Sequence, residues 1–391
     1  MRGELIRETA VKYGQAPPLA AMKRGTEYMI DENYERLAAA LEALPSGFPK
    51  TPSRVELRIL KKAFTAEEAE LTGHMSRKYE TINELAGRVG WSAKKVREVL
   101  QSVLPRKLVR KRVDEKQEYY RLGPFIVGWW EALMEGPMCH DIEFATLTQQ
   151  LMREGGGERI MAPRPGVLGV VPARGSLKPE LLQPYDDIDA HFARYERFGL
   201  IDCVCRVDRN LLGSKCSKPV KRCGFVGLPP RIPLSESVLN REQALKLFTQ
   251  LEDEGHVHTG FYGFIMGAET PQFVGCCNCC GDCCGILRVI NEGISTEGPQ
   301  RSNYRAFLKT ESCLACGDCV ERCQVHAITQ DKAGIAEINR DKCIGCGLCV
   351  IKCAGDAIEL VPVSAEEWFH VPTSFEEWEE RRLQNISTVQ H

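Results

Sequence analysis

Two stretches near the C-terminus repeat one cysteine pattern, SCLACGDCVERCQVHAI at residues 312–328 and KCIGCGLCVIKCAGDAI at residues 342–358. Each reads Cys-x-x-Cys-x-x-Cys-x-x-x-Cys. The cysteines of the two runs are Cys313, Cys316, Cys319 and Cys323, then Cys343, Cys346, Cys349 and Cys353. A disulfide scaffold would be short and would begin with a signal peptide, so thiols in this pattern indicate metal ligation.

The spacing also favours one kind of metal group. Structural zinc sites use Cys-x-x-Cys pairs separated by a longer loop, whereas these are compact four-cysteine runs. Three closely spaced thiolates can hold one face of a cubane while the fourth cysteine leaves along a following helix. The two runs therefore predict two 4Fe-4S clusters.

Residues 301–361, which contain both runs, resemble the bacterial two-cluster ferredoxins. The resemblance implies that ligands are exchanged between the runs. One cluster would be bound by Cys313, Cys316, Cys319 and Cys353, and the other by Cys343, Cys346, Cys349 and Cys323. The chain departs from that family after each fourth cysteine, where Gln324 and Ala354 replace the usual proline.

A second cysteine-rich region lies upstream. Its first stretch carries four thiols, the number that one complete site needs, at Cys203, Cys205, Cys216 and Cys223. The Cys-x-Cys start is unusual for structural zinc, and neighbouring lysines and arginines would offset the charge of a thiolate-bound cluster. We expect a third 4Fe-4S cluster here, with zinc as the alternative.

The stretch GCCNCCGDCCG at residues 275–285 holds three adjacent pairs: Cys276 and Cys277, Cys279 and Cys280, Cys283 and Cys284. Neighbouring residues of a strand point to opposite faces, so one compact site would need a tight loop. The favoured interpretation is a fourth 4Fe-4S cluster with two spare thiols. The alternatives are two clusters that share ligands with upstream cysteines, and an unusual cluster with a bridging thiolate. The two Cys-Cys-Gly triplets resemble the non-cubane sites of heterodisulfide reductases, although that family's long spacings are missing.

The N-terminal third lacks such chemistry. Residues 53–122 resemble winged-helix domains, with a helix before a turn at Gly90, a helix opening at Ser92 and a strand pair around Asp114 and Glu115. Basic residues that could contact phosphate begin the second helix and lead into the strand pair, namely Lys94, Lys95, Arg97, Arg106, Lys107, Arg110, Lys111 and Arg112. The alternative is a solvated or protein-docking face.

Composition limits the remaining possibilities. Lys+Arg 51 against Asp+Glu 53 gives a net charge of -2, which argues against a nucleic-acid coat. No apolar run is long enough to span a membrane and the first residues lack an export signal, so we expect a cytoplasmic protein. The isolated Cys139 is expected to be a buried core residue, and His256 and His258 to be inert surface side chains at a helix exit.

These features predict an α+β multidomain fold. Its expected parts are an N-terminal helical segment (1–50), a winged-helix-like domain (51–134), a cysteine-rich cluster-binding middle domain (135–300), a two-cluster ferredoxin domain (301–361) and a C-terminal tail (362–391). The segment 125–134 is expected to be a packed helix, and the tail to clamp a partner or to cover its own chain, including the ferredoxin core.

The function expected is electron transfer through three or four 4Fe-4S clusters, in a subunit of a cytoplasmic oxidoreductase complex of an anaerobe. No residue is assigned a catalytic role, because no dinucleotide, P-loop or nucleophile motif is present. The partners would be other redox proteins. The alternatives are a redox-sensing winged-helix regulator that binds DNA, and a reductase with an unusual cluster at the paired cysteines.

Overall fold

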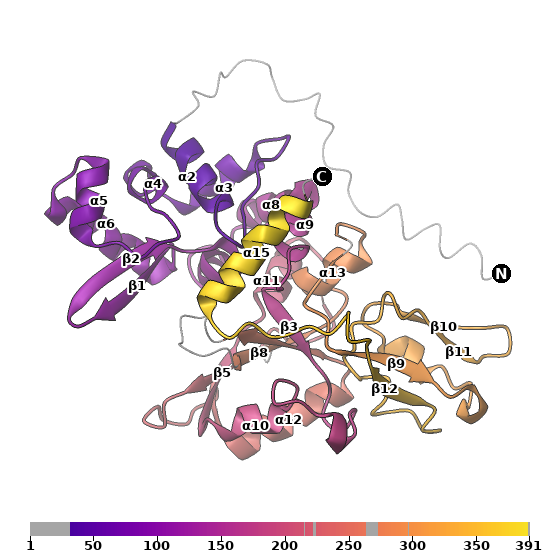
Figure 1. The fold of residues 1–391 in the computed structure, drawn as a ribbon. Coiled ribbons are helices and arrows are strands. Elements are labelled where there is room, and N and C mark those ends of the chain that lie inside the picture. Colours follow the sequence, from indigo (N-terminus) through magenta and orange to yellow (C-terminus); the bar gives the residue numbers. More distant parts are fainter. Residues whose placement is uncertain (1–31, 215, 222–223, 263–272, 296, 390–391) are drawn as a thin grey trace. The chain divides into compact units, whose positions relative to one another are not determined.

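A computed structural model describes residues 32–389 except residues 215, 222–223, 263–272 and 296 (Figure 1). Cys223 and most of the expected N-terminal helical segment, residues 1–31, therefore lie outside the described residues. The chain alternates helices with short antiparallel sheets, which confirms a mixed α and β fold.

Helices dominate the first part of the described chain. Thr65 and Thr81 form capping boxes with Glu68 and Glu84, which satisfy the free N–H groups at the starts of two helices. Gly90, at φ 74°, ends one of them in the left-handed conformation. The helices are α2 (Glu32–Glu42), α3 (Val55–Ala63), α4 (Ala66–Gly73), α5 (Ile82–Val89), α6 (Ala93–Val103) and the 3-10 turn Leu104–Arg106.

A hairpin of β1 (Val109–Asp114) and β2 (Gln117–Leu122) follows and turns at Glu115 and Lys116, as expected. The expected helix over 125–134 is shorter in the structure, where α7 spans Trp130–Met134. The backbone of residues 126–128 is not helical, and the Gly128 N–H donates to the Glu131 carboxylate at 2.6 Å. The Glu131 carboxylate, in the first turn of α7, thus accepts a hydrogen bond from a backbone N–H that precedes the helix.

One core connects these helices with later segments. Phe48, Phe125 and Trp129 meet ring to ring inside it, and Trp378 from the C-terminal tail belongs to the same buried cluster. Two further helices contribute, α8 (Ile142–Leu151) and α9 (Gly157–Met161), which are joined by an irregular turn at residues 152–156. The core therefore crosses the domain boundaries that the sequence suggested at residues 50 and 134.

The middle of the chain forms a six-stranded, fully antiparallel sheet in the order β3-β7-β8-β5-β4-β6. Its strands are β3 (Leu168–Val171), β4 (Arg197–Ile201), β5 (Gly224–Leu228), β6 (Val238–Asn240), β7 (Val257–Tyr262) and β8 (Phe273–Cys279). Helices α10 (Ile188–Ala193) and α12 (Arg241–Asp253) cover one face through Phe192 and Phe248 (Figure 1). The remaining helices of this region are α11 (Val204–Leu211), α13 (Gly285–Asn291) and the 3-10 turn Pro179–Leu181.

The C-terminal cysteine runs lie in the loops, turns and short helix that connect the strands of two small two-stranded sheets. Strand β9 (Tyr304–Leu308) pairs with β12 (Ile358–Pro362), and β10 (Ile328–Gln330) pairs with β11 (Ala336–Ile338). A 3-10 turn (Thr310–Ser312) and α14 (Asp318–Arg322) complete this part. The fully buried Tyr304 ties it to the middle region, because its hydroxyl lies 2.5 Å from the Leu181 carbonyl and 3.1 Å from the Asp186 carboxylate.

The tail ends in α15 (Phe375–Val389). Residues before this helix contact the ferredoxin-like part, since Asn303 exchanges hydrogen bonds with the Phe369 backbone. The helix itself packs into the N-terminal core through Trp378. The tail thus covers its own chain, but α15 packs in the N-terminal core cluster and not in the core of the cysteine runs. Among the helices of the described residues, none combines the length and apolar character needed to cross a membrane.

Arg382 of α15 is fully buried and donates to the carbonyls of Pro45, Pro163, Pro165 and Ile160. The change Arg382→Met should leave these carbonyls without a donor and lower the free energy of unfolding by roughly 3–5 kcal/mol. Urea unfolding of anaerobically prepared protein would measure the loss. Arg381→Met is the matched control, because Arg381 is partly exposed, and should cost less than about 1 kcal/mol. Equal losses in the two variants would contradict this role.

The buried carboxyl of Asp186 should make the folding stability depend on pH. Burial raises the pKa of its carboxyl to about 6, while the hydrogen bond from Tyr304 opposes the shift. The unfolded chain ionises at a lower pH, so folding stability should fall by about 3 kcal/mol as pH rises from about 4 to 6 and stay low above that range. Asp186→Asn should abolish the slope in pH-dependent thermal melts. Tyr304→Phe should extend the slope to higher pH; a wild-type profile that matches Asp186→Asn would refute the idea.

Candidate metal centres

The two C-terminal runs meet in space. One cavity is lined by Cys313, Cys316 and Cys319 of the first run together with Cys353 of the second. On the other side, burial raises the pKa of the Cys346 thiol to about 12, with further contributions from the neighbouring thiols of Cys343 and Cys323. The structure thus brings together the two sets of four cysteines that the ferredoxin resemblance implied.

Backbone N–H groups point at several of these sulfurs. Ala327 donates to Cys323 Sγ at 3.1 Å and Ala357 to Cys353 Sγ at 3.2 Å, each four residues after its acceptor. Ala306 donates to Cys343 Sγ at 3.5 Å. Such donors stabilise the negative charge of a thiolate, so these sulfurs are prepared to act as ligands.

Gln324, which stands where the related ferredoxins have proline, joins this part to the paired cysteines. Its side-chain oxygen accepts the Gly281 N–H at 2.8 Å, and the Asn291 amide donates to its carbonyl at 2.9 Å. A Cβ atom on Gly281 would lie 2.4 Å from the Gln324 carbonyl, so only glycine allows this approach.

The paired-cysteine stretch runs along β8 and then into a loop. Cys276 packs on the face covered by α10 and α12, whereas Cys279 packs on the opposite face with Cys284. The strand therefore separates thiols that are adjacent in the sequence, as its alternation requires. Cys284 precedes α13, which begins at Gly285.

The sulfur atoms on the side of the sheet away from α10 and α12 form two groups. Cys280 Sγ lies 3.8 Å from Cys216 Sγ and 3.1 Å from Cys283 Sγ, and the three sulfurs all lie within 4.8 Å of one another. Cys284 interacts instead with Cys205 and Cys279: the contact with Cys205 lowers the pKa of the Cys284 thiol, while Cys279 and burial raise it, and the net shift is upward.

The grouping expected from the sequence is therefore not the grouping that the structure brings together. Cys216 had been assigned with Cys203 and Cys205, but it lies beside two thiols of the paired stretch. The sharing of ligands between the two stretches was one of the alternatives left open, and these contacts support it. The fourth member of the expected upstream set, Cys223, lies outside the described residues.

A cavity of about 140 Å³ adjoins the second group. Six thiols line it, those of Cys203, Cys205, Cys277, Cys279, Cys280 and Cys284. Its other walls are mainly apolar, including Trp130 and Phe261. Several thiols around one mainly apolar cavity suit a bound metal-sulfur group, because thiolates are ligands of such groups.

Two carboxyls stand near this cavity. Burial raises the pKa of Asp208 to about 7 and that of Glu131 to about 7, and in both cases the Cys205 thiol adds to the shift. Asp208 accepts a hydrogen bond from the Gln149 amide. Both carboxyls can thus hold a proton near neutral pH beside the Cys205 sulfur, a feature that the sequence did not indicate.

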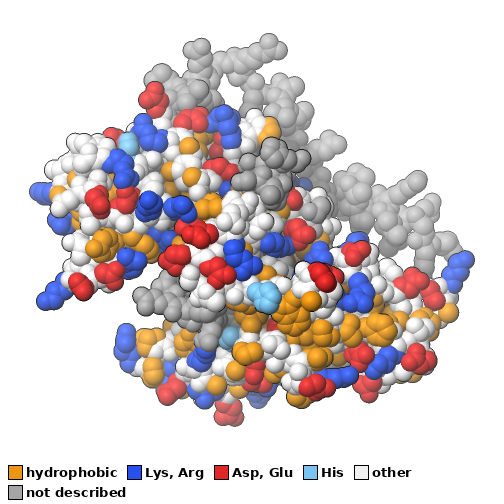
Figure 2. Space-filling model, in the orientation of Figure 1, with side chains coloured by type: hydrophobic (Ala, Val, Ile, Leu, Met, Phe, Trp, Pro, Cys, Tyr) orange, Lys and Arg blue, Asp and Glu red, His pale blue; other side chains and the backbone are white. Residues whose placement is uncertain are grey.

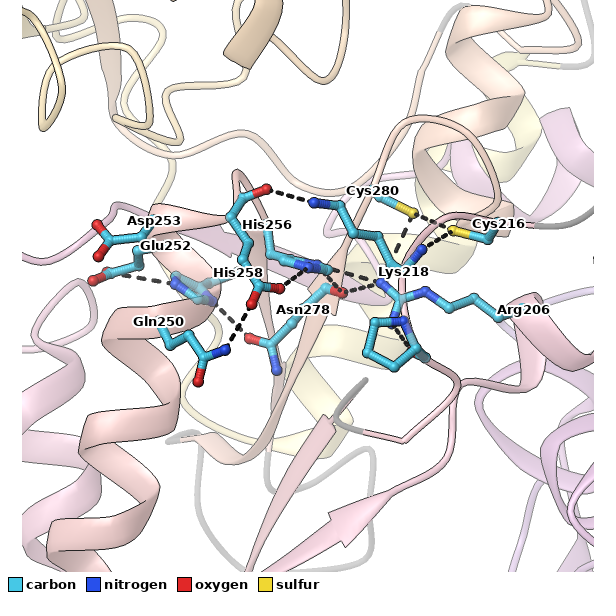
Figure 3. Close-up of polar contacts among 12 residues, drawn as sticks. Arg206, Cys216, Lys218, Gln250, Glu252, Asp253, His256, His258, Asn278 and Cys280 are labelled. Carbon is cyan, nitrogen blue, oxygen red and sulfur yellow. Dashed lines mark hydrogen bonds and ion pairs between the residues drawn. The ribbon is translucent and has the colours of Figure 1, made fainter.

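The expectation of two surface histidines is wrong. His258 lies on the interior strand β7, His256 directly precedes that strand, and both side chains are fully buried. His258 contacts the Asn278 side chain at 2.8 Å and stacks on Phe248, while His256 contacts the Asn278 carbonyl and Arg206 (Figure 3). The histidines thus join the sheet to the buried Arg206 next to Cys280.

Cys139 lies apart from these groups. It is half-buried in the turns after α7, which corrects the expectation of a fully buried core residue. It therefore serves as a control position for experiments on the other cysteines.

Comparison with known proteins identifies one part of the chain. Residues 306–360 match the family model of the 4Fe-4S dicluster domain. Neither the curated proteins nor the solved structures give a significant match to the chain. The C-terminal part is therefore a 4Fe-4S dicluster domain, as expected, and its two groups of four thiols with their N–H donors fit two such clusters.

The exchange of ligands between the runs can be tested with paired variants. Cys353→Ser should remove one cluster, about four iron atoms per chain, because Cys353 shares a cavity with Cys313. Adding Cys313→Ser should cause no further loss, whereas adding Cys343→Ser should remove the second cluster as well. Iron and sulfide analysis of anaerobic protein would measure this. The opposite pattern, with additive loss for Cys313 and none for Cys343, would show that the runs bind independently.

Proposed function

We propose that this protein is an iron-sulfur electron carrier, a subunit of a cytoplasmic oxidoreductase complex in an anaerobe. When bound, 4Fe-4S clusters supply one-electron transfer without substrate chemistry of their own. The observation that carries the proposal is a shared core: Cys279 and Cys284 pack in the same buried cluster as Cys343 and Cys349 of the dicluster domain. Thiols of the two cysteine-rich regions thus belong to one buried core.

A third 4Fe-4S cluster fits the cavity beside the sheet. We assign its four ligands to thiols among the cavity-lining cysteines Cys203, Cys205, Cys277, Cys279 and Cys284. The apolar walls exclude water there, and the carboxyls of Asp208 and Glu131 can remain protonated so that they add no negative charge beside the thiolates. The contact between Gln324 and Gly281 holds this site against the dicluster domain.

The opposite end of the route lies near the surface. Cys316 is exposed, and Leu314 between two ligands of the first set is 64% exposed. Figure 2 shows apolar side chains gathered over the lower right of the molecule, where Figure 1 places β9 and β12. An apolar, accessible edge beside a cluster suits contact with a redox partner protein.

A DNA-binding regulator is the alternative that the N-terminal part suggests. The α5–α6 pair, the β1–β2 hairpin and the bridge between Glu80 and Tyr120 fit a winged-helix arrangement. However, four of its eight named bases pair with carboxylates, among them Lys95 with Glu67 and Arg112 with Asp114. Figure 2 shows both charges interspersed at the upper left rather than one basic face. We therefore interpret this unit as a protein-docking module.

A reductase with an unusual cluster at the paired cysteines has the cavity as its one supporting observation. A substrate would have to share about 140 Å³ with the bound group. This is far below the several hundred Å³ of ordinary ligand pockets, so electron transfer explains the cavity better.

The proposal is tested on anaerobically purified full-length protein. We expect about twelve iron and twelve sulfide per chain and dithionite-reducible EPR signals, since each cubane contains four of each. Cys205→Ser should reduce the count to about eight, while the control Cys139→Ser should leave it unchanged. Colourless protein, or protein whose reduced clusters pass no electrons to an added redox acceptor protein, would overturn the electron-transfer role. A gel shift with DNA in either redox state would favour the regulator instead.

A further inference from the structure

Near the end of β8 lie two pairs of adjacent cysteines, and in each pair the two thiols belong to different sulfur groups. Cys284 interacts with Cys205 and Cys279, whereas Cys280 and Cys283 lie beside Cys216. We propose that Cys216, Cys280 and Cys283 bind a single zinc ion, a centre distinct from every iron-sulfur cluster of the chain. This inference is independent of the electron-transfer role.

The sulfur separations point to one ion. Tetrahedral zinc holds its sulfur ligands at about 2.3 Å, which places neighbouring sulfurs about 3.8 Å apart. Cys280 Sγ lies 3.8 Å from Cys216 Sγ and 3.1 Å from Cys283 Sγ, and all three sulfurs lie within 4.8 Å of one another, so the group is compact enough for one ion. In a cubane each thiolate binds a different iron, so its ligands stand farther apart.

The dicluster domain provides an internal comparison. Its eight cysteines are all among the described residues and line up in two sets, yet no three of them meet the same 4.8 Å limit in the part of the chain that the structure describes. The three sulfurs of the proposed zinc centre are thus closer together than sulfurs arranged for cubanes in the same molecule. A single-ion centre explains the difference.

The surroundings suit a compact anionic centre. Cys280 and Cys283 are buried, and the Arg206 guanidinium, only 1% exposed, lies 3.8 Å from Cys280 Sγ. The Lys218 backbone N–H donates to Cys216 Sγ at 3.4 Å (Figure 3). Three thiolates and one Zn²⁺ carry a net charge of -1, which one buried guanidinium balances.

The position of Arg206 is itself fixed. Its guanidinium also donates to the Pro219 carbonyl at 2.7 Å and contacts His256 at 3.3 Å. The buried positive charge is therefore held at the sulfur group by protein contacts on two sides. This buried positive charge can balance the negative charge of a zinc thiolate centre at the same place.

Zinc here would join the upstream segment to the loop between the cysteine pairs. That loop carries Cys279 and Cys284, whose thiols turn to the neighbouring cavity. The same backbone residues would then set the geometry of two centres, so removing zinc should loosen the adjacent site without unfolding the dicluster domain.

The experiment is metal analysis of the anaerobically purified full-length protein. We expect about one zinc per chain in the wild type, and a loss of at least tenfold in Cys216→Ser and in Cys283→Ser. Iron and sulfide of the dicluster domain should remain, as shown by unchanged EPR signals, which also establishes that the variants fold. Cys276→Ala, from the same stretch but the opposite sheet face, is the matched control and should keep its zinc.

Cobalt(II) replacement provides a second readout. Wild-type protein loaded with cobalt should show the absorption of a tetrahedral thiolate complex, and Cys216→Ser should lack it. Loss of iron and sulfide instead of zinc in the Cys216 and Cys283 variants would overturn the proposal. So would zinc that is absent from the wild type or unaffected by both substitutions.

Discussion

The rest of this structure depends on one constraint, which is that many thiols are buried inside the protein. A thiol ionises less readily inside a protein, and burial raises the pKa of Cys346 to about 12. Only a bound cation makes such thiolates stable at neutral pH, because ligand deprotonation and metal binding occur together. The cysteine-rich parts of the chain are therefore expected to reach their full stability only when metal is bound.

The geometry of β8 and of the short loop after it determines where each of the adjacent cysteines points. Cys276 turns to the apolar face under α12, while Cys277 and Cys279 turn to the cavity. Beyond the strand, the loop sends Cys280 and Cys283 toward Cys216. Two neighbouring cysteines can thus each donate a ligand to a different metal centre, which a single cysteine could not do.

The dicluster domain could be predicted from sequence because its information is local. Three of four ligands in each set lie within seven residues, and the family resemblance supplied the fourth. The helices at Thr65 and Thr81 were predictable for the same reason, since a capping box is contained within four residues. The grouping of thiols in the middle region was not predictable from sequence, because Cys216 and Cys280, which meet in space, are 64 residues apart in the chain. His256 and His258 were misjudged for this reason: a helix exit is ordinarily exposed, but here it leads into a central strand.

The departure from the ferredoxin pattern has a physical explanation at one of its two positions. A proline at 324 would lack the side-chain oxygen that accepts the Gly281 N–H, so the paired-cysteine loop would lose its hydrogen bond to the dicluster domain. This contact also requires glycine at position 281, because any side chain there would collide with the Gln324 carbonyl. Ala354, the corresponding residue of the second run, has no side-chain oxygen with which to make such a bond. The asymmetry marks the end of the first run at Cys323, whose thiol groups with Cys343 and Cys346, as the side of the dicluster domain that faces the other metal centres.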